Sequence, residues 1–487
     1  MSLARRSITS VSWNMGANLV NVAVLFIRTV LLARWLPVDV FGVYAFASSV
    51  IGLTSVLPKF GMGGAFLHRT TETEDENLAA SVHFTIKLLL TAIWAGCLAG
   101  WALLFLTGET RLALLVLTFT TGGLELTQTP RLILVRRVVH RRLAFIQIVN
   151  VTLTTVVAIG LSLRGATLWA LLATDIVTFL LNVAALYIWR PVWRPRLKWQ
   201  PDVVRYFLHF GGRNFLASAL LKTLDRVDDL WTGIYLGKTD LGFYSKAYTF
   251  ATYPRRILAA PINMVARGTY AELKENRNLL SQAFFRIIAL LVRSGFLLAG
   301  LLFLVAPEFI RLLLGEKWLP MLDAFRLMLA FTLFDPIKVT ISSLFIAVGH
   351  PEKVVWTRLL QLGILLTGLF VLGPRFGIAG VALAVDGMLV VGIVVLLWLA
   401  RAYVDFSTGK LFFVPLAALA AGVLSGYGVS RFPAVKASDW TLGAAKSIVF
   451  VTVYGMILLA LERQQLFGLI NKVRQSLHAG DNIRTIG

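Results

Sequence analysis

Charged and amide side chains recur at helical spacing inside two otherwise apolar segments, near residues 9–33 and 206–236. The polar residues of the first segment are Asn14, Asn18, Asn21 and Arg28. Those of the second are Asn214, Ser218, Lys222 and Arg226 in one row, Asp225 and Asp229 beside it, and Asp228 on a neighbouring face. Spacings of three, four and seven residues place side chains on one face of a helix. Arginine and lysine in a medium of low dielectric constant suit phosphate or pyrophosphate, so these faces predict an anion-binding site.

The second segment cannot present this face to lipid. Each charge at the centre of a membrane costs roughly 2.5–3.5 kcal/mol, so its five charged residues would cost on the order of 12–17 kcal/mol. Two interpretations remain open, and they overlap. Lys222 and Arg226 neutralise Asp225 and Asp229 three residues further on, or the face lines a water-filled cavity.

Three further carboxylates lie in apolar sequence: Glu125, Asp175 and Asp386. A buried carboxylate can take up a proton or bind Na⁺, and we count these three with Asp225 and Asp229 as candidate coupling acids. The alternative is a carboxylate that only packs helices together near the outer membrane boundary. The six histidines are scattered and Cys97 is the single cysteine, so the sequence predicts neither a metal site nor a cofactor.

The elements that must position these side chains are membrane-spanning helices. The chain has 57% hydrophobic and 15% charged residues, whereas soluble domains have about 45–50% and 25%. An all-α, polytopic membrane protein is therefore expected. Segments of about 20 apolar residues number fourteen, near 9–33, 38–58, 79–106, 111–134, 143–163, 166–189, 206–236, 240–266, 282–306, 320–348, 352–373, 376–401, 410–430 and 440–461.

The net charge of +22 is distributed unevenly between the loops. With fourteen spans, the loops on the side of the termini hold more than twice as many lysines and arginines as the others. Basic residues collect in cytoplasmic loops, so both termini are predicted to be cytoplasmic. The same residues meet membrane lipids. No basic stretch stands apart from a membrane segment, which argues against nucleic acid as a partner.

The chain also contains an internal repeat. Residues 36–47 are similar to 236–247 at an offset of 200, and residues 164–175 to 375–386 at an offset of 211. Six helices per repeat give both halves the same orientation, with a pseudo-two-fold axis along the membrane normal. We expect a first lobe over 1–200, a second lobe over 201–405, two further helices over 406–465 and a cytoplasmic amphipathic tail over 466–487.

The repeat also shows where the two halves differ. Arg28 corresponds to Asp228, and Phe46 corresponds to Lys246. The framework is repeated but the charge is not, and a repeat transporter usually holds its substrate between its halves. The asymmetric positions are therefore candidates for substrate recognition.

Several loose motifs carry a family resemblance over nearly the whole chain. They are Ser12-Trp13-Asn14-Met15-Gly16, Leu36 with Phe41-Gly42-Val43-Tyr44, Phe60-Gly61-Met62-Gly63, Asp225 with Asp229, Leu236-Gly237, Leu241-Gly242-Phe243-Tyr244-Ser245-Lys246-Ala247, Pro254, and Phe376-Gly377-Ile378-Ala379-Gly380-Val381-Ala382. With these residues the chain resembles polysaccharide flippases of the Wzx type, near the colanic-acid exporter branch of the MOP (multidrug/oligosaccharidyl-lipid/polysaccharide) superfamily.

The resemblance implies a flippase of the bacterial cytoplasmic membrane. Its substrate would be an undecaprenyl-pyrophosphate-linked oligosaccharide, moved by alternating access for surface polysaccharide synthesis. Polymerase and glycosyltransferases of the same pathway would be partners. Arg28 would match an arginine that related lipid II flippases need in their first helix. Two alternatives are kept: a cation-coupled multidrug antiporter of the same superfamily, and a membrane-embedded polymerase or acyltransferase. A multidrug antiporter would be expected to have an acidic interior. A polymerase or acyltransferase would be expected to have a large catalytic loop, which we do not find in the sequence, so we expect that the protein is not an enzyme.

Overall fold

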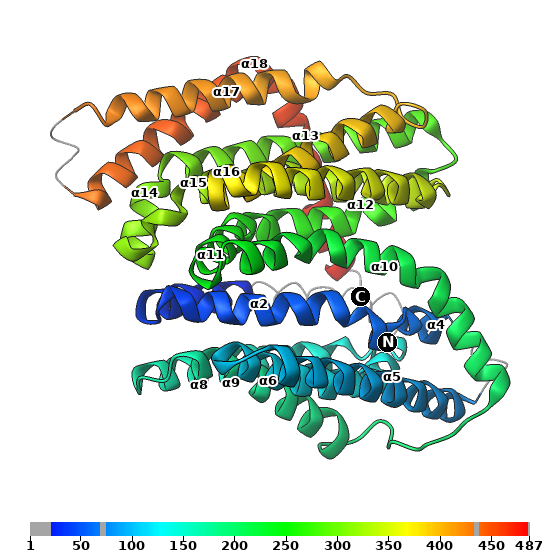
Figure 1. Cartoon of the computed structure of the whole chain (residues 1–487). Coiled ribbons are helices and arrows are strands. Elements are labelled where there is room, and N and C mark those ends of the chain that lie inside the picture. Colours follow the sequence, from blue (N-terminus) through cyan, green and yellow to red (C-terminus); the bar gives the residue numbers. More distant parts are fainter. Residues whose placement is uncertain (1–20, 69–74, 433–437, 486–487) are drawn as a thin grey trace.

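The computed structural model of the chain describes residues 21–68, 75–432 and 438–485 (Figure 1). Within these ranges the chain forms helices and connecting loops and contains no strand, which confirms the all-α class. Asn14 and Asn18 lie outside the described residues, as does the side chain of Asn214.

The elements fall into two consecutive groups. The first comprises a helix over residues 21–35, α2 (Val38–Thr54), α3 (Val56–Lys59), α4 (Met62–His68), α5 (Glu76–Phe105), α6 (Gly108–Leu126), α7 (Gln128–Arg136), α8 (His140–Leu163), α9 (Leu168–Val183) and η1 (Ala184–Ile188). The second comprises α10 (Pro201–Tyr235), α11 (Lys238–Pro254), η2 (Arg255–Ala259), α12 (Ala260–Leu273), α13 (Arg277–Leu304), α14 (Ala306–Phe309), η3 (Ile310–Leu314), η4 (Glu316–Met321), α15 (Leu322–Ala347), α16 (Pro351–Ala400), α17 (Thr408–Val429) and α18 (Asp439–Thr485).

Nine helical segments of the described residues are long and apolar enough to cross a membrane. One of them, α16, covers two of the predicted spans. Near the junction of these two spans, Gly377 adopts a left-handed conformation (φ 57°) that bends the helix. The charged helix α10 is not among these nine segments. The short helix η2 separates α11 from α12. The protein is thus a multi-pass membrane protein, while fourteen as the number of spans stays a prediction.

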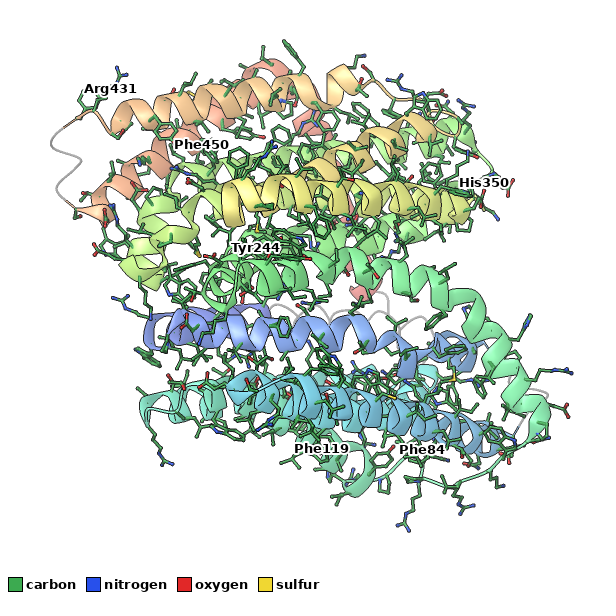
Figure 2. The ribbon with its side chains drawn as sticks, in the orientation of Figure 1. Phe84, Phe119, Tyr244, His350, Arg431 and Phe450 are labelled. Atoms are coloured by element: carbon green, nitrogen blue, oxygen red, sulfur yellow. The ribbon has the colours of Figure 1, made fainter. Side chains whose placement is uncertain are left out.

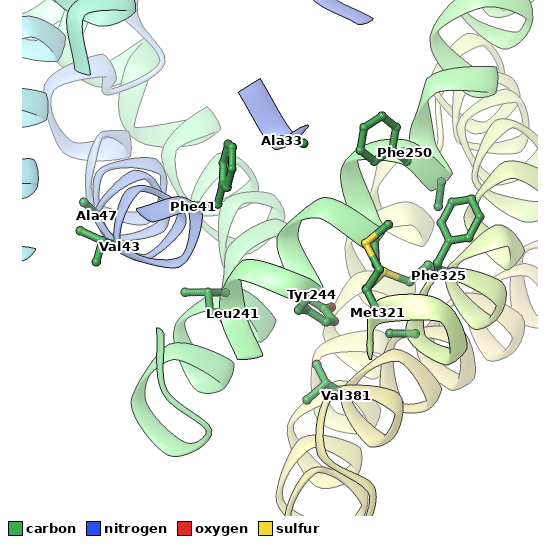
Figure 3. Packing of buried hydrophobic residues seen from close by; sticks show 14 of the residues in the cluster. Ala33, Phe41, Val43, Ala47, Leu241, Tyr244, Phe250, Met321, Phe325 and Val381 are labelled. Atoms are coloured by element: carbon green, nitrogen blue, oxygen red, sulfur yellow. The ribbon is translucent and has the colours of Figure 1, made fainter. Parts of the chain in front are cut away.

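The two groups lie side by side with their long helices roughly parallel (Figure 1). The helix α10 joins them: Phe207 in its first half packs between Phe66 and His83 of the first group, and Trp231 in its second half packs against Phe370 of α16. A single buried apolar cluster, shown in part in Figure 3, then continues from one group into the other.

The repeated segments contact one another reciprocally. Helices α2 and α11 each have 17 residues and begin and end 200 positions apart. A Cβ atom on Gly42 would overlap the backbone of Lys238, and one on Gly242 would overlap the backbone of Val38, the repeat equivalent of Lys238. A contact in which each partner presents the same surface is what a two-fold relation requires.

This glycine contact gives a first prediction. Gly42→Leu and Gly242→Leu should each force α2 and α11 apart and destabilise the fold, because the added side chain meets a backbone that cannot move aside. The measurement is the melting temperature of the purified protein. Gly428→Leu on α17, where a Cβ atom meets nothing within 4 Å, is the control. Different outcomes for Gly42→Leu and Gly242→Leu would contradict a reciprocal contact.

Two buried ion pairs connect α18 to α14 and α13 within the second group. Lys446 Nζ lies 2.6 Å from Glu308 Oε1, and Arg293 donates to both carboxylate oxygens of Glu462 at 2.6 and 2.7 Å. Glu462 has a non-helical backbone and bends α18, which continues as a helix to Thr485. The amphipathic character of this tail, and its place at the inner membrane surface, stay predictions.

Candidate functional site

A cavity of about 710 Å³ lies where the helix over residues 21–35 approaches α10, η2, α12, α15 and α16. The polar residues that line it are Asn21, Asp225, Asp228, Tyr248, Arg255, Arg256, Asn263, Arg267, Asp335, Lys338, Ser342, Ser343, Thr357, Arg358 and Gln361. Residues of both repeats therefore border one polar space.

The lining has a formal excess of two positive charges, from five basic and three acidic residues. Two of the basic residues pair with the buried Asp335, whose carboxylate lies 2.5 Å from Arg255 Nη1 and 2.8 Å from Lys338 Nζ. This carboxylate therefore holds the side chains of both basic residues in position at the wall of the cavity.

The other three cations have no carboxylate within ion-pair distance among the described residues. Arg267 donates to Ser343 Oγ at 3.3 Å, Arg256 lies over the ring of Tyr253, and Arg358 is half-buried. Guanidinium groups that face a polar space without a carboxylate can accept phosphate oxygens through paired N–H donors. The cavity is suited to an anionic group.

Neutral hydrogen-bonding groups lie among these charges. Asn263 bonds to Thr340, and Gln361 donates to the carbonyl oxygen of Met388 at 3.2 Å, so each amide has a fixed orientation. Ser342 and Thr357 add hydroxyl groups to the wall. Amides and hydroxyls of this kind can bind the hydroxyl groups of a sugar.

The predicted pairs on α10 are formed. Lys222 Nζ lies 3.9 Å from Asp225 Oδ2, and Arg226 Nη1 lies 3.4 Å from Asp229 Oδ2, which also accepts a bond from Ser49 at 2.9 Å. Asp225 lines the cavity at the same time. Pairing and a cavity thus coexist on this helix, and the part that Lys222 and Arg226 play in binding stays a prediction.

Arg28 belongs to a different environment. It does not line the cavity but donates to Thr154 Oγ1 of α8 at 3.1 Å, near Tyr44, which bonds to Asp175 at 2.8 Å. The charge of Lys246, which lies 3.9 Å above the ring of Phe41, also acts on Arg28. The structure therefore brings Arg28 and Asp175 together, while Lys222 and Arg226, like Arg28, do not line the cavity.

The repeat is asymmetric at this point. Tyr44 bonds to Asp175, but its equivalent Tyr244 bonds to Asp228 of α10 at 2.5 Å. Asp386, the equivalent of Asp175, has a buried Oδ1 atom without a hydrogen-bond partner among the described residues. Its function as a coupling acid stays a prediction.

Glu125 lies in the first group, away from the cavity. Its carboxylate is 2.5 Å from Lys87 Nζ and 3.6 Å from Lys59 Nζ. Both Glu125 and Lys87 are buried, so their pair joins α6 to α5. Asn21, by contrast, lines the cavity, and its role in binding stays a prediction.

Several lining residues were not among the predicted site residues. Arg255 and Arg256 follow Pro254 near the end of the apolar segment 240–266, and Arg267 lies one residue beyond that segment. The sequence does contain a signal for Asp335 and Lys338, because they are two opposite charges three residues apart inside the apolar segment 320–348. The same energetic argument that singled out α10 applies to them.

The cavity lies toward one end of the molecule. Its lining includes Ile346 at the end of α15 and Val354 at the start of α16, next to His350, which Figure 2 labels. At the opposite end the two groups are joined: Asp39 accepts a bond from Thr239 at 2.6 Å, and Trp318 donates to the carbonyl oxygen of Ala33 at 2.8 Å. The cavity thus reaches the first end, whereas at the second end the two groups are held together by these contacts.

The sequence of this chain is similar to those of proteins of polysaccharide biosynthesis. A family described as "Polysaccharide biosynthesis protein" matches residues 31–323. The lipopolysaccharide biosynthesis protein WzxC of Escherichia coli is 24% identical over 406 residues, 81% of this chain and 80% of that protein. The succinoglycan biosynthesis transport protein ExoT of Rhizobium meliloti is 25% identical over 322 residues, 63% of each chain.

Solved structures show the same fold. The lipid II flippase MurJ in an inward closed conformation superimposes with a TM-score of 0.76 at 16% identity, covering 94% of this chain and 100% of that one. An inward-facing multidrug-resistance MATE transporter of the MOP superfamily gives 0.60 at 18% identity, covering 81% and 94%. The fold is that of MOP-superfamily transporters, as the sequence motifs indicated.

Proposed function

Because the chain belongs to the polysaccharide biosynthesis protein family, we propose that it is a flippase, and not an enzyme, for lipid-linked oligosaccharides. Its substrate is an undecaprenyl-pyrophosphate-linked repeat unit, which it moves from the inner to the outer leaflet of the cytoplasmic membrane. The product supplies surface polysaccharide synthesis, so polymerase and glycosyltransferases act in the same pathway.

The observation that carries this proposal is the charge of the cavity. Five cations face three carboxylates there, and Arg256, Arg267 and Arg358 have no carboxylate partner in the described part of the chain. A pyrophosphate group has the opposite charge, and the amides and hydroxyls beside it suit the attached sugars. A multidrug antiporter for cations would need an acidic interior, so the same excess of positive charge disfavours that alternative.

The position of the cavity supports an inward-facing state. The basic loops around Lys274, Arg277 and Lys353 lie at the same end as the cavity, and we expect this end to be cytoplasmic because basic residues collect in cytoplasmic loops. Both termini then lie on this side as well. In the transport cycle, the lobes of residues 1–200 and 201–405 separate at the α2–α11 contact and close over the cavity, which exposes the bound head group to the outside.

The test is export by cells that carry cavity variants. Arg267→Ala/Arg358→Ala should reduce polysaccharide export at least tenfold at normal protein level, since each charge-assisted hydrogen bond contributes about 1.5–3 kcal/mol. Lipid-linked repeat units should accumulate in the inner leaflet. The matched control is Arg164→Ala/Arg375→Ala, which removes two exposed arginines that do not line the cavity, one directly after α8 and one beside the bend of α16.

Single variants Arg28→Ala and Lys222→Ala separate the two predicted cationic regions. We expect export to fall in both, because Arg28 and Lys222 each lie on a polar helix face between the lobes. Undiminished export in both would remove these two residues from the transport path. Normal export without accumulated intermediates in the Arg267→Ala/Arg358→Ala variant would reject the cavity as the head-group site.

A further inference from the structure

Basic and aromatic residues alternate in the segment of residues 189–199, which connects η1 to α10 and thereby the two lobes. The segment contains Trp189, Arg190, Trp193, Arg194, Arg196, Lys198 and Trp199, and it contains no acidic residue. It follows directly on a membrane-spanning segment that ends at Ile188. The proposed transport mechanism assigns no role to this composition.

The backbone of the segment is held in place by the first group of helices. Arg142 donates to the carbonyl oxygens of Ala185, Trp189 and Arg190 at 2.6, 2.7 and 3.0 Å. The ring of Trp193 is buried against Phe84. The segment is therefore an anchored part of the structure and not a loose tether.

A further bond fixes the end of the segment near α10. The backbone N–H of Lys198 donates to Thr85 Oγ1 of α5 at 3.1 Å. With Arg142 at one end, Trp193 in the middle and Lys198 at the other, the backbone is held along its whole length. Its remaining side chains are free to point outward.

The charged side chains of the anchored segment point outward. Arg194, Arg196 and Lys198 are exposed and make no ion pair within the described residues. The apolar side chains between and beside them are exposed as well: Trp199 is 59% and Leu197 67% accessible. Exposed tryptophan and leucine beside unpaired cations are typical of a surface that lies at a membrane interface.

The depth of the segment agrees with such a position. A helix of 30 residues, the length of α5, is about 45 Å long, and exceeds the hydrocarbon thickness by about 15 Å. The far end of α5 is apolar and exposed at Leu104 and Phe105, so the excess lies at the end where Asp75 caps the helix. Thr85, and with it Lys198, then lies near the boundary between head groups and hydrocarbon.

We propose that residues 189–199 form a binding surface for the head groups of anionic phospholipids. The exposed guanidinium and ammonium groups bind lipid phosphates, while Trp199 and Leu197 insert at the head-group boundary. Phe84, which packs against the segment, and His350, at the open end of the cavity, lie toward the same end of the molecule (Figure 2). The surface thus holds the connection between the lobes against the inner leaflet.

The inference is tested by measuring lipid binding to the purified full chain. Native mass spectrometry gives the apparent Kd for phosphatidylglycerol, with phosphatidylcholine as reference. Arg194→Gln/Arg196→Gln/Lys198→Gln should weaken phosphatidylglycerol binding at least tenfold, because each basic residue near an anionic surface contributes about fivefold. The difference should shrink as salt is raised. Binding of phosphatidylcholine should not change.

Two controls identify what the surface binds. Arg164→Gln/Arg375→Gln/Arg431→Gln removes three exposed arginines elsewhere and should leave phosphatidylglycerol binding unchanged. An equal loss in both triple variants would overturn the proposal, because net charge alone would then explain it. Inorganic pyrophosphate should not displace the lipid. Displacement by pyrophosphate would assign the segment to the transported substrate instead, and would leave the proposed flippase function standing.

Discussion

Replacing Lys87 with methionine is expected to destabilise the first lobe by about 3–5 kcal/mol, the usual loss when one partner of a buried ion pair is removed. Lys87 is fully buried, Glu125 is 5% exposed, and their charged atoms are 2.5 Å apart. Without Lys87, the remaining ion-pair partner of Glu125 in the described part of the chain is Lys59, which is 44% exposed and 3.6 Å away. The melting temperature of the purified protein should fall by roughly 3–5 °C.

The double variant Lys87→Met/Glu125→Met makes this prediction specific. Replacing both charges with apolar side chains of similar volume is often neutral or stabilising, so the double variant should recover most of the lost stability. Arg137→Ala is the matched control, because its pair with Glu76 is exposed and contributes about 0–1 kcal/mol. A double variant as unstable as Lys87→Met would show that the loss comes from packing and not from an unpaired carboxylate.

Replacing Asp335 with alanine is expected to have an equally large effect, within the cavity itself. The side chain is buried and contacts both Arg255 at 2.5 Å and Lys338 at 2.8 Å. Its loss leaves two cations at the cavity wall without their common carboxylate, which should cost about 3–5 kcal/mol. Export should fall more than tenfold, because this carboxylate holds both cations in position.

An added anion should partly replace the missing carboxylate. Inorganic pyrophosphate should raise the melting temperature of Asp335→Ala more than that of the unaltered protein, because a ligand that binds only the folded state stabilises it. Asp335→Asn, which keeps the shape of the side chain, provides a second variant if the alanine variant does not fold. Equal responses of unaltered and variant proteins to pyrophosphate would contradict an anion site at Arg255 and Lys338.

The sequence by itself predicted the helical elements, the internal repeat and the ion pairs within one helix. Apolar length and composition predicted the helical membrane fold, and the 200-residue offset predicted the equivalence of α2 and α11. Spacing along one helix also predicted the pairs Lys222–Asp225 and Arg226–Asp229. These features depend only on residues a few positions apart or on similarity between two segments, and both can be read directly along the chain.

Which charges share a cavity was decided by the tertiary structure. Helical spacing shows that Arg28 and Lys222 each lie on a polar face, but it does not show which faces meet. Packing placed Arg28 beside Thr154, and instead brought Arg255 to Asp335 and Arg267 to Ser343, each about 80 residues further along the chain. Contacts between helices distant in sequence depend on how all the helices pack against one another, and no spacing within a single helix records that arrangement.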